Sequence, residues 1–135
     1  MRQILAPILL IVLLFPALAL GETKDDLVYR EGLYYKKFSE VPFTGKTTGK
    51  TQGSFRKGKE DGPCVFYWDN GQLHSKGTYK DGKIDGPWVF YWDNGELSYK
   101  GTFKDGKEDG LWIYYHENGQ LWQKGTYKNG VKISD

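Results

Sequence analysis

The sequence predicts an all-β protein, in which repeated β-hairpins form an open antiparallel meander and hence a single elongated, curved sheet. The first observation is a repeat, because Gly53, Gly77, Gly101 and Gly125 lie 24 residues apart. The second is a pair of turn signals, Asn-Gly and Asp-Gly, which recurs along the chain and favours tight β-turns. The third is the aromatic and β-branched segment before each Asn-Gly, where no helical period competes with the strand pattern.

The repeat divides the chain into three parts. Residues 1–21 are expected to be a signal peptide, 22–52 an N-terminal cap with a degenerate first repeat, and 53–135 a repeat domain. The copies within the repeat domain are 53–76, 77–100, 101–124 and a partial copy at 125–135. The irregular ends are expected, because the terminal copies of a repeat protein cap the stack.

The first part has the layout of a secretory signal. Arg2 precedes an apolar run from Ile4 to Phe15, and small residues follow it. We therefore expect export to the periplasm or the cell exterior, with cleavage near Ala19 or Gly21. A retained membrane anchor is the alternative, although the apolar run is short for a bilayer core of about 30 Å.

The charge and the cysteine content exclude several classes of protein. The 135 residues carry a net charge of +2, which is too close to zero for a protein that binds nucleic acid through a basic surface. Cys64 is the only cysteine, so no internal disulfide can form. The length fits one domain, and no fingerprint of a nucleotide or other cofactor is present.

The turns also predict the register of the strands. We expect Asn94-Gly95 to form a two-residue type I′ turn, because such a turn needs φ > 0 at both central residues. Asp81-Gly82 is expected to form a second turn of two residues. The pairs expected across these two turns are Trp92 with Leu97, Phe90 with Tyr99, Trp88 with Gly101, Tyr91 with Ser98, Val89 with Lys100, Tyr79 with Ile84 and Ser75 with Trp88.

This register gathers aromatic side chains on one face of the sheet, which we call the packed face. The residues expected there are Phe66, Trp68, Leu73, Tyr79, Trp88, Phe90, Trp92, Leu97, Phe103, Trp112, Tyr114 and Leu121. Each repeat glycine lies opposite the column of Cys64, Trp88 and Trp112, where a ring can lie flat over bare backbone. At Cys64 we expect a small void, or filling by an N-terminal residue such as Phe43. The packed face could be covered by residues 22–42, by curling of the sheet, or by a second copy of the chain.

The opposite face, here the second face, carries two repeated rows of side chains. Val65, Val89 and Ile113 are expected between the rows. These rows are the candidate partner-binding residues, since repeated aromatic and cationic side chains make a regular ladder of contacts. An ordinary solvated sheet face is the alternative. The candidate residues are Tyr67, Tyr91, Tyr115, Lys76, Lys100 and Lys124.

The repeated columns resemble those of MORN-variant repeats (membrane occupation and recognition nexus, second type). The matching residues are Asp85-Gly86-Pro87-Trp88, Tyr91, Asn94-Gly95, Leu97 and 100–107. The resemblance covers residues 43–135, and segment 27–36 is similar to the start of bacterial members labelled YwqK-family antitoxins. It implies an elongated sheet of hairpins and non-catalytic work such as scaffolding, protein contact or toxin neutralisation. The predicted export signal, however, does not fit the role of a cytoplasmic antitoxin.

No catalytic, metal-binding or cofactor-binding residue is predicted. His74 is expected on the face of Tyr67, and His116 in place of a tryptophan on the packed face, so the two cannot form a metal pair. Cys64 has no expected base beside it and is interpreted as a small core filler. Nothing in the pattern gathers a nucleophile, a base and a donor, so the protein is not expected to be an enzyme.

The sequence therefore predicts an exported protein-binding module. Its partner would be another protein, either a toxin in an immunity-type role or a protein of the cell envelope. The alternative is binding of an envelope ligand, such as choline, a wall glycan or lipid, through repeated aromatic residues. Nucleic acid is not an expected partner, membrane contact is left open, and a homodimer is one way to cover the packed face.

Overall fold

A computed structural model describes residues 21–135, so the predicted signal peptide lies almost wholly outside the described residues. The N-terminal part holds six short strands and one helical turn. Its elements are β1 (Glu22–Thr23), the 3-10 turn η1 (Lys24–Asp26), β2 (Leu27–Arg30), β3 (Leu33–Lys36), β4 (Gly45–Thr48), β5 (Thr51–Arg56) and β6 (Lys59–Glu60). The repeats supply β7 (Gly62–Tyr67), β8 (Leu73–Lys80), β9 (Lys83–Tyr91), β10 (Leu97–Lys104), β11 (Lys107–Tyr115), β12 (Leu121–Lys128) and β13 (Val131–Ser134).

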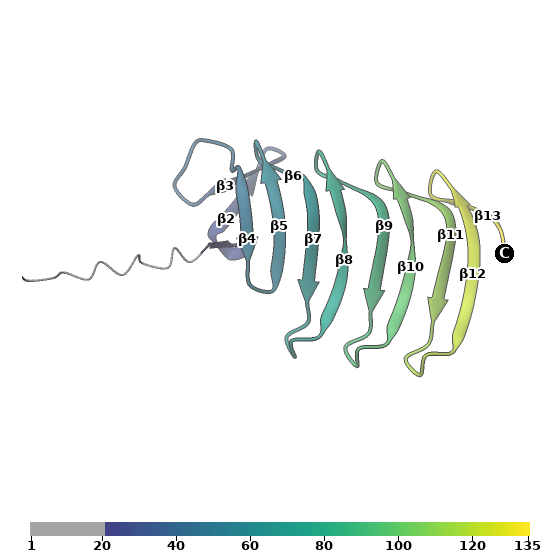
Figure 1. Ribbon diagram of the computed structural model, residues 1–135. Helices are drawn as coiled ribbons and strands as arrows, with labels where there is room; N and C mark the ends of the chain where they lie inside the picture. Colours follow the sequence, from purple (N-terminus) through teal and green to yellow (C-terminus); the bar gives the residue numbers. More distant parts are fainter. Residues whose placement is uncertain (1–20) are drawn as a thin grey trace, which may run out of the picture.

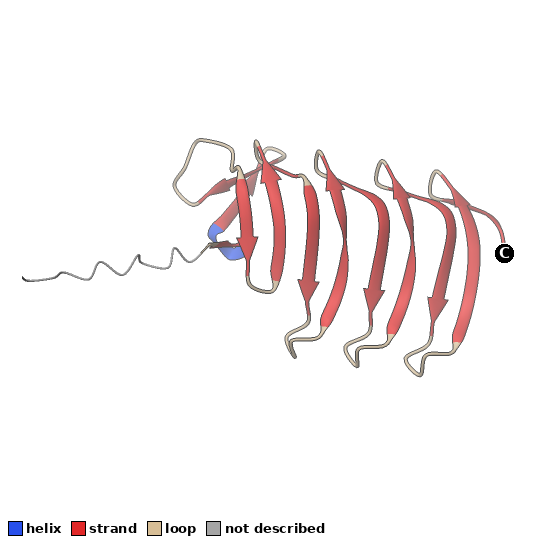
Figure 2. Cartoon of the chain, in the orientation of Figure 1, coloured by secondary structure: helices blue, strands red, loops and turns tan. Residues whose placement is uncertain are grey.

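The predicted open antiparallel meander is confirmed. The strands follow the order β1-β4-β5-β7-β8-β9-β10-β11-β12-β13 in one sheet, with β6 paired to β5. Figure 1 shows this sheet as a single, bowed layer that does not close, and Figure 2 shows strands along its whole length. Two features depart from a pure meander, since β1 runs parallel to β4, and β2 with β3 forms a separate two-stranded sheet.

The two kinds of turn differ in geometry. At Asp81-Gly82 both residues have positive φ, +47° and +82°, so this is the two-residue type I′ turn. Asn94 has no positive φ, and only Gly95, at +88°, is left-handed. Here the amide of Gly95 donates to the carbonyl of Trp92 (3.0 Å) and the amide of Trp92 to the carbonyl of Glu96 (2.8 Å). The type I′ prediction for Asn94-Gly95 is therefore wrong: the turn is a three-residue loop with a glycine bulge.

This bulge changes the pairing nearest the loop. Tyr91 pairs with Leu97, and the ladder shifts by one residue before Tyr99 pairs with Phe90. The predicted pairs Trp92 with Leu97 and Tyr91 with Ser98 are therefore wrong, because the loop holds one residue more than expected. It follows that Leu97, and likewise Leu73 and Leu121, belong to the second face with the tyrosines. The pairs Val89 with Lys100 and Trp88 with Gly101 are confirmed.

A second irregularity follows the Asp-Gly turn. Tyr79 pairs with Ile84 as predicted, but Ser75 pairs with Phe90 and not with Trp88. The shift occurs where Gly86, with φ +80°, adds extra residues to β9. Because the ladder slips by an even number of residues, the aromatic side chains remain on the predicted face.

The repeat glycines make room for tryptophan rings, as expected, although the ring comes from the following strand. A Cβ at Gly77 would lie 2.2 Å from the ring of Trp88, and one at Gly101 would lie 2.2 Å from the ring of Trp112. The indole nitrogen of Trp88 donates to the carbonyl of Thr78 (3.2 Å), which holds the ring across the strand. Trp88 and Trp112 are thereby buried in a sheet of one layer.

The packed face is covered mainly by its own rings. Phe90 stacks on Tyr99 with centroids 4.2 Å apart, and Tyr99 stacks on Tyr114 at 5.7 Å. Burial raises the pKa of Tyr79 to about 12, in agreement with its place on this face. Ring-on-ring contact therefore shields much of the apolar surface without a second layer.

The N-terminal cap covers only the beginning of this face. Leu27, Phe43 and Phe55 form a small buried cluster, and Tyr34 packs against it. Lys24 lies over the Tyr34 ring and pairs with Glu60 at 3.0 Å. Phe43 thus belongs to the cap.

Beside Cys64, where the first copy lacks a tryptophan, the structure has a cavity of about 10 Å³. Residues that line it include Phe55, Phe66 and Tyr79. The expected void is therefore present, at about the smallest size that can hold one water.

Candidate functional site

The second face presents the two predicted rows in a fixed order. Tyr67, Tyr91 and Tyr115 end β7, β9 and β11, and each pairs with a leucine of the next strand: Leu73, Leu97 and Leu121. Tyr67 is exposed, and Tyr91 and Tyr115 are half-buried. No ring contact joins these tyrosines within residues 21–135. The tyrosine row is therefore an alternation of tyrosine and leucine side chains. The sequence predicted these leucines on the packed face, because a two-residue Asn-Gly loop was assumed.

The lysine row runs parallel to the tyrosine row. Lys76 pairs with Val65 on one side and Val89 on the other, and Lys100 is held in the same way between Val89 and Ile113. Lys124 completes the row opposite Ile113. All three lysines are exposed, and none of them forms an ion pair in the described part of the chain. Their charges are therefore available to a partner.

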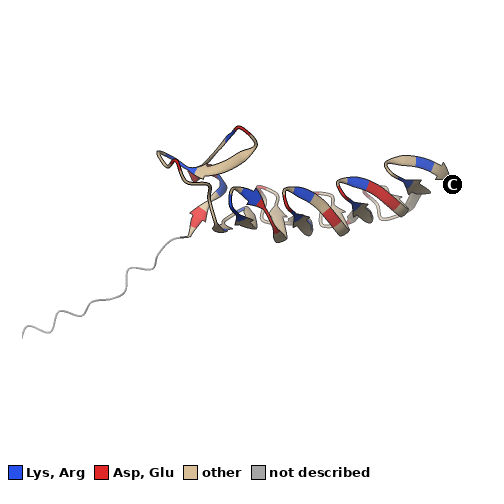
Figure 3. Ribbon diagram, turned by 90° about the horizontal axis from the view of Figure 1, so that it is seen from above, with Lys and Arg blue, Asp and Glu red and all other residues tan. Residues whose placement is uncertain are grey.

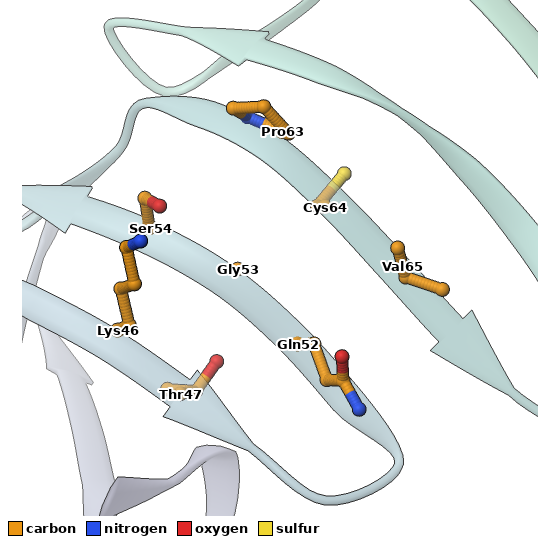
Figure 4. A pocket seen from close by; sticks show the side chains of 8 residues that line it. All are labelled: Lys46, Thr47, Gln52, Gly53, Ser54, Pro63, Cys64 and Val65. Carbon is orange, nitrogen blue, oxygen red and sulfur yellow. The ribbon is translucent and has the colours of Figure 1, made fainter. Parts of the chain in front are cut away.

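Shallow hollows lie between the rows and the turn end of the sheet. One, of about 290 Å³, is lined by Pro87, Val89, Lys100, Thr102, Leu111 and Ile113. Its counterpart two repeats earlier, of about 250 Å³, lies around Gly53 between β4, β5 and β7, as Figure 4 shows. The hollows have apolar walls and a polar rim, a chemistry suited to a protruding apolar side chain. Sequence reasoning did not find them, because they depend on the curvature of the sheet.

Among known protein families, the MORN repeat variant matches this repeated architecture, at residues 60–81, 84–105 and 108–129. The chain is a MORN repeat protein. Each matched MORN segment runs from the strand that carries the buried tryptophan, or Cys64, to the next tight turn. A comparison with curated proteins found no match.

Charged residues of both signs follow the MORN repeats along the edge of the tight turns. Figure 3 shows bands of basic and acidic residues that recur from repeat to repeat along this edge. Several of these charges pair with one another: Arg56 contacts Asp61 at 3.3 Å and Asp81 at 3.1 Å, and Lys128 contacts Asp109 at 3.3 Å. The turn edge thus carries carboxylates that pair with some of its basic residues, whereas within residues 21–135 no carboxylate pairs with the lysine row.

The histidines of the MORN repeats do not form a site. The His74 ring lies 4.2 Å from the ring of Trp68, so His74 is on the packed side and the prediction that it shares a face with Tyr67 is wrong. The cause is again the bulge beside the Asn-Gly loop, which turns one extra side chain to that side. His116 lies 5.8 Å from Trp122, at the other end of the sheet. Within residues 21–135, no group of three or more His, Cys, Asp or Glu could hold a metal ion.

No helix in the part of the chain that the structure describes is long and apolar enough to span a membrane.

Cys64 is a buried thiol in the first MORN repeat. Its Sγ lies 3.5 Å from the carbonyl oxygen of Gly77, and burial raises the pKa of the thiol to about 11. Because only the thiolate is nucleophilic, we expect iodoacetamide at pH 8 to label the folded protein roughly a hundredfold more slowly than the urea-unfolded chain. Equal rates in the two states, measured by mass spectrometry, would contradict this burial.

Proposed function

We propose that this MORN repeat protein is an exported, non-catalytic binding module that recognises another protein through its second face. The observation that carries the proposal is the ordered pair of rows, tyrosine with leucine and lysine with valine or isoleucine, on a face that no other element of residues 21–135 covers. Export rests on the signal-like layout of residues 1–21.

The rows define the chemistry of the partner. The three lysines would attract carboxylates, while the tyrosines offer flat amphipathic contact area. The hollows would receive apolar side chains that protrude between those carboxylates. The partner surface is therefore acidic, with apolar residues spaced along it.

An immunity-type role is the finer form of this proposal. The likeness of segment 27–36 to the start of YwqK-family antitoxins supports it, and the partner would then be an exported toxin. Co-expression with a toxin encoded by a neighbouring gene tests this form, since protection should depend on the lysine row.

Binding of an envelope ligand is the alternative, because Phe90, Tyr99 and Tyr114 form a half-exposed stack of rings. Quaternary ammonium groups bind to such rings by cation–π attraction. Titration with choline or wall fragments, followed by tryptophan fluorescence, separates the two. A saturable change would favour this alternative over the protein partner.

Site-specific photocrosslinking tests the proposed surface. A benzophenone amino acid at Tyr91 should give a defined adduct in the exporting cell, whereas the same group at Tyr29, an exposed tyrosine of the cap, should not. Replacing Lys76, Lys100 and Lys124 with glutamate should lower the adduct yield more than about tenfold, because like charges would oppose the acidic partner. The proposal fails if Tyr29 gives the same adduct, or if the charge reversal leaves the yield unchanged.

A further inference from the structure

The last strands leave one edge of the sheet half open. β13 pairs with β12 only at Thr126, Tyr127 and Lys128. The remaining part of β12, Leu121 to Gly125, pairs with β11 on one side and with no strand of residues 21–135 on the other. The corresponding part of β10 is paired on both sides, with β9 and with β11. The open stretch is therefore a place where one strand of the repeat pattern is lacking.

Two side-chain hydrogen-bond donors at this edge also indicate that a strand is absent beside it. Between earlier copies, the Asn94 amide donates to the carbonyl of Glu117 (2.9 Å), and the Trp92 indole to the carbonyl of Tyr115 (3.2 Å). Asn70 and Trp68 make the same two bonds one copy earlier. In the last copy these positions are Asn118 and His116, and no carbonyl of the described residues receives a hydrogen bond from either side chain.

The apolar side chains of this edge are also uncovered. Leu121 is 56% exposed and Trp122 60% exposed, whereas their counterparts Leu97 and Ser98 are half-buried and buried. Beside them lies an open hollow of about 530 Å³, lined by His116, Glu117, Asn118 and Gln120. The surface of each repeat that packs against the next repeat is thus exposed to solvent at the end of the sheet.

We propose that this edge binds an extended strand of another protein, which adds to the sheet antiparallel to the open part of β12. Its carbonyls would accept from Asn118 and His116, and its alternate side chains would cover Leu121 and Trp122. Lys128 and Lys132 are already paired with Asp109 and Asp135, so Lys124 is the charged residue of the open stretch that forms no ion pair within residues 21–135. A second copy of this chain is disfavoured, because symmetric pairing would bring Lys124 close to its own copy. The same unpaired charge favours a strand that carries a carboxylate. This site lies on the edge of the sheet; it shares Leu121 and Lys124 with the second face but uses none of the tyrosines and hollows of that face.

A peptide with the sequence of residues 110–117 is the probe, because in the intact chain this segment pairs with β10 and accepts the bonds from Asn94 and Trp92. By the same register, its counterparts of Tyr114 and Ile113 should lie opposite Gln123 and Lys124. We expect saturable binding to the full chain, with amide hydrogen exchange slowed at residues 121–125 and unchanged at the second-face residues of the earlier copies, 65–67 and 89–91.

The matched variants are Asn118→Asp and Asn94→Asp. Both keep the Oδ1 acceptor that the turn uses, at 3.0 and 2.9 Å from the amides of Gln120 and Glu96, and both lose the side-chain donor. N118D should weaken peptide binding about fivefold, the effect of one lost hydrogen bond, and N94D should not. Equal affinities for the two variants, or no protection at 121–125, would overturn the proposal. So would sedimentation showing a dimer whose amides at 121–125 are protected without peptide.

Discussion

Replacing Gly101 with alanine should destabilise the protein by about 3 kcal/mol, the upper part of the range for overpacked cores. A Cβ at this position would lie 2.2 Å from Cδ2 of Trp112, far inside van der Waals contact. The ring cannot move away easily, since Trp112 is only 2% exposed and Phe103 packs edge-on against it at 4.8 Å. Urea unfolding of the variant and the wild type measures the difference.

Gly53 provides the matched control. It occupies the same column of the first copy, but the nearest atom to a Cβ there is Cβ of Cys64 at 3.6 Å, an ordinary contact. Gly53→Ala should therefore change the free energy of unfolding by no more than about 0.5 kcal/mol. Adding Trp112→Leu to Gly101→Ala should cost less than the sum of the single changes, because the clash is removed. Equal losses at Gly53 and Gly101 would mean that the ring does not cover the glycine.

The second large effect is expected at Trp88. Trp88→Ala should cost about 3–5 kcal/mol, as removal of a buried aromatic side chain usually does. The side chain is 3% exposed, and its ring contacts those of Phe90 at 5.7 Å and Tyr79 at 5.5 Å. Because small domains are stable by only about 5–15 kcal/mol, the variant should lie close to the limit of folding. Thermal and urea unfolding followed by circular dichroism measure the loss.

Tyr91→Ala is the control on the opposite face. Tyr91 lies three residues further along β9, so its side chain points away from Trp88, and it pairs with Leu97. We expect a loss of about 1 kcal/mol or less, the size of one cross-strand contact. If Tyr91→Ala unfolded the protein while Trp88→Ala did not, the assignment of the two faces would be inverted.

The parts of the fold that the sequence predicts are those with a strict period. Trp88 and Tyr91 lie on opposite faces because side chains alternate along a strand, and no loop lies between them. Phe90 pairs with Tyr99, and Val89 with Lys100, as predicted, because the one-residue shift before Tyr99 compensates for the longer loop. The requirement for glycine at 77 and 101 could also be predicted, since each lies next to a column of bulky rings.

The remaining details depend on choices that the same dipeptide allows. Asn-Gly suits both a two-residue type I′ turn and a three-residue loop with a glycine bulge, so the place of Leu97 could not be read from Asn94-Gly95. Gly86 has positive φ inside a strand, and Lys57, an unusual residue for that region, forms a turn with φ +49°.

The candidate site was predicted only in part. Tyr91 and Lys100 lie on the expected face, but the leucines and the hollows beside them depend on bulges and curvature. Leu97 could have been assigned to the tyrosine row if both loop lengths had been tested. The open edge at Leu121 is a feature of strand pairing, which no local pattern encodes.

The central claim is that tryptophan rings lie flat on glycines of one face, which leaves the tyrosine and lysine rows of the other face for a partner. NMR spectroscopy of the Hα protons of Gly77 and Gly101 tests it most directly. We predict marked upfield ring-current shifts and nuclear Overhauser effects to the indoles of Trp88 and Trp112, with neither feature at Gly53. Unshifted glycines, or indole contacts from Trp88 to the side chains of Lys100 and Tyr91, would contradict the account.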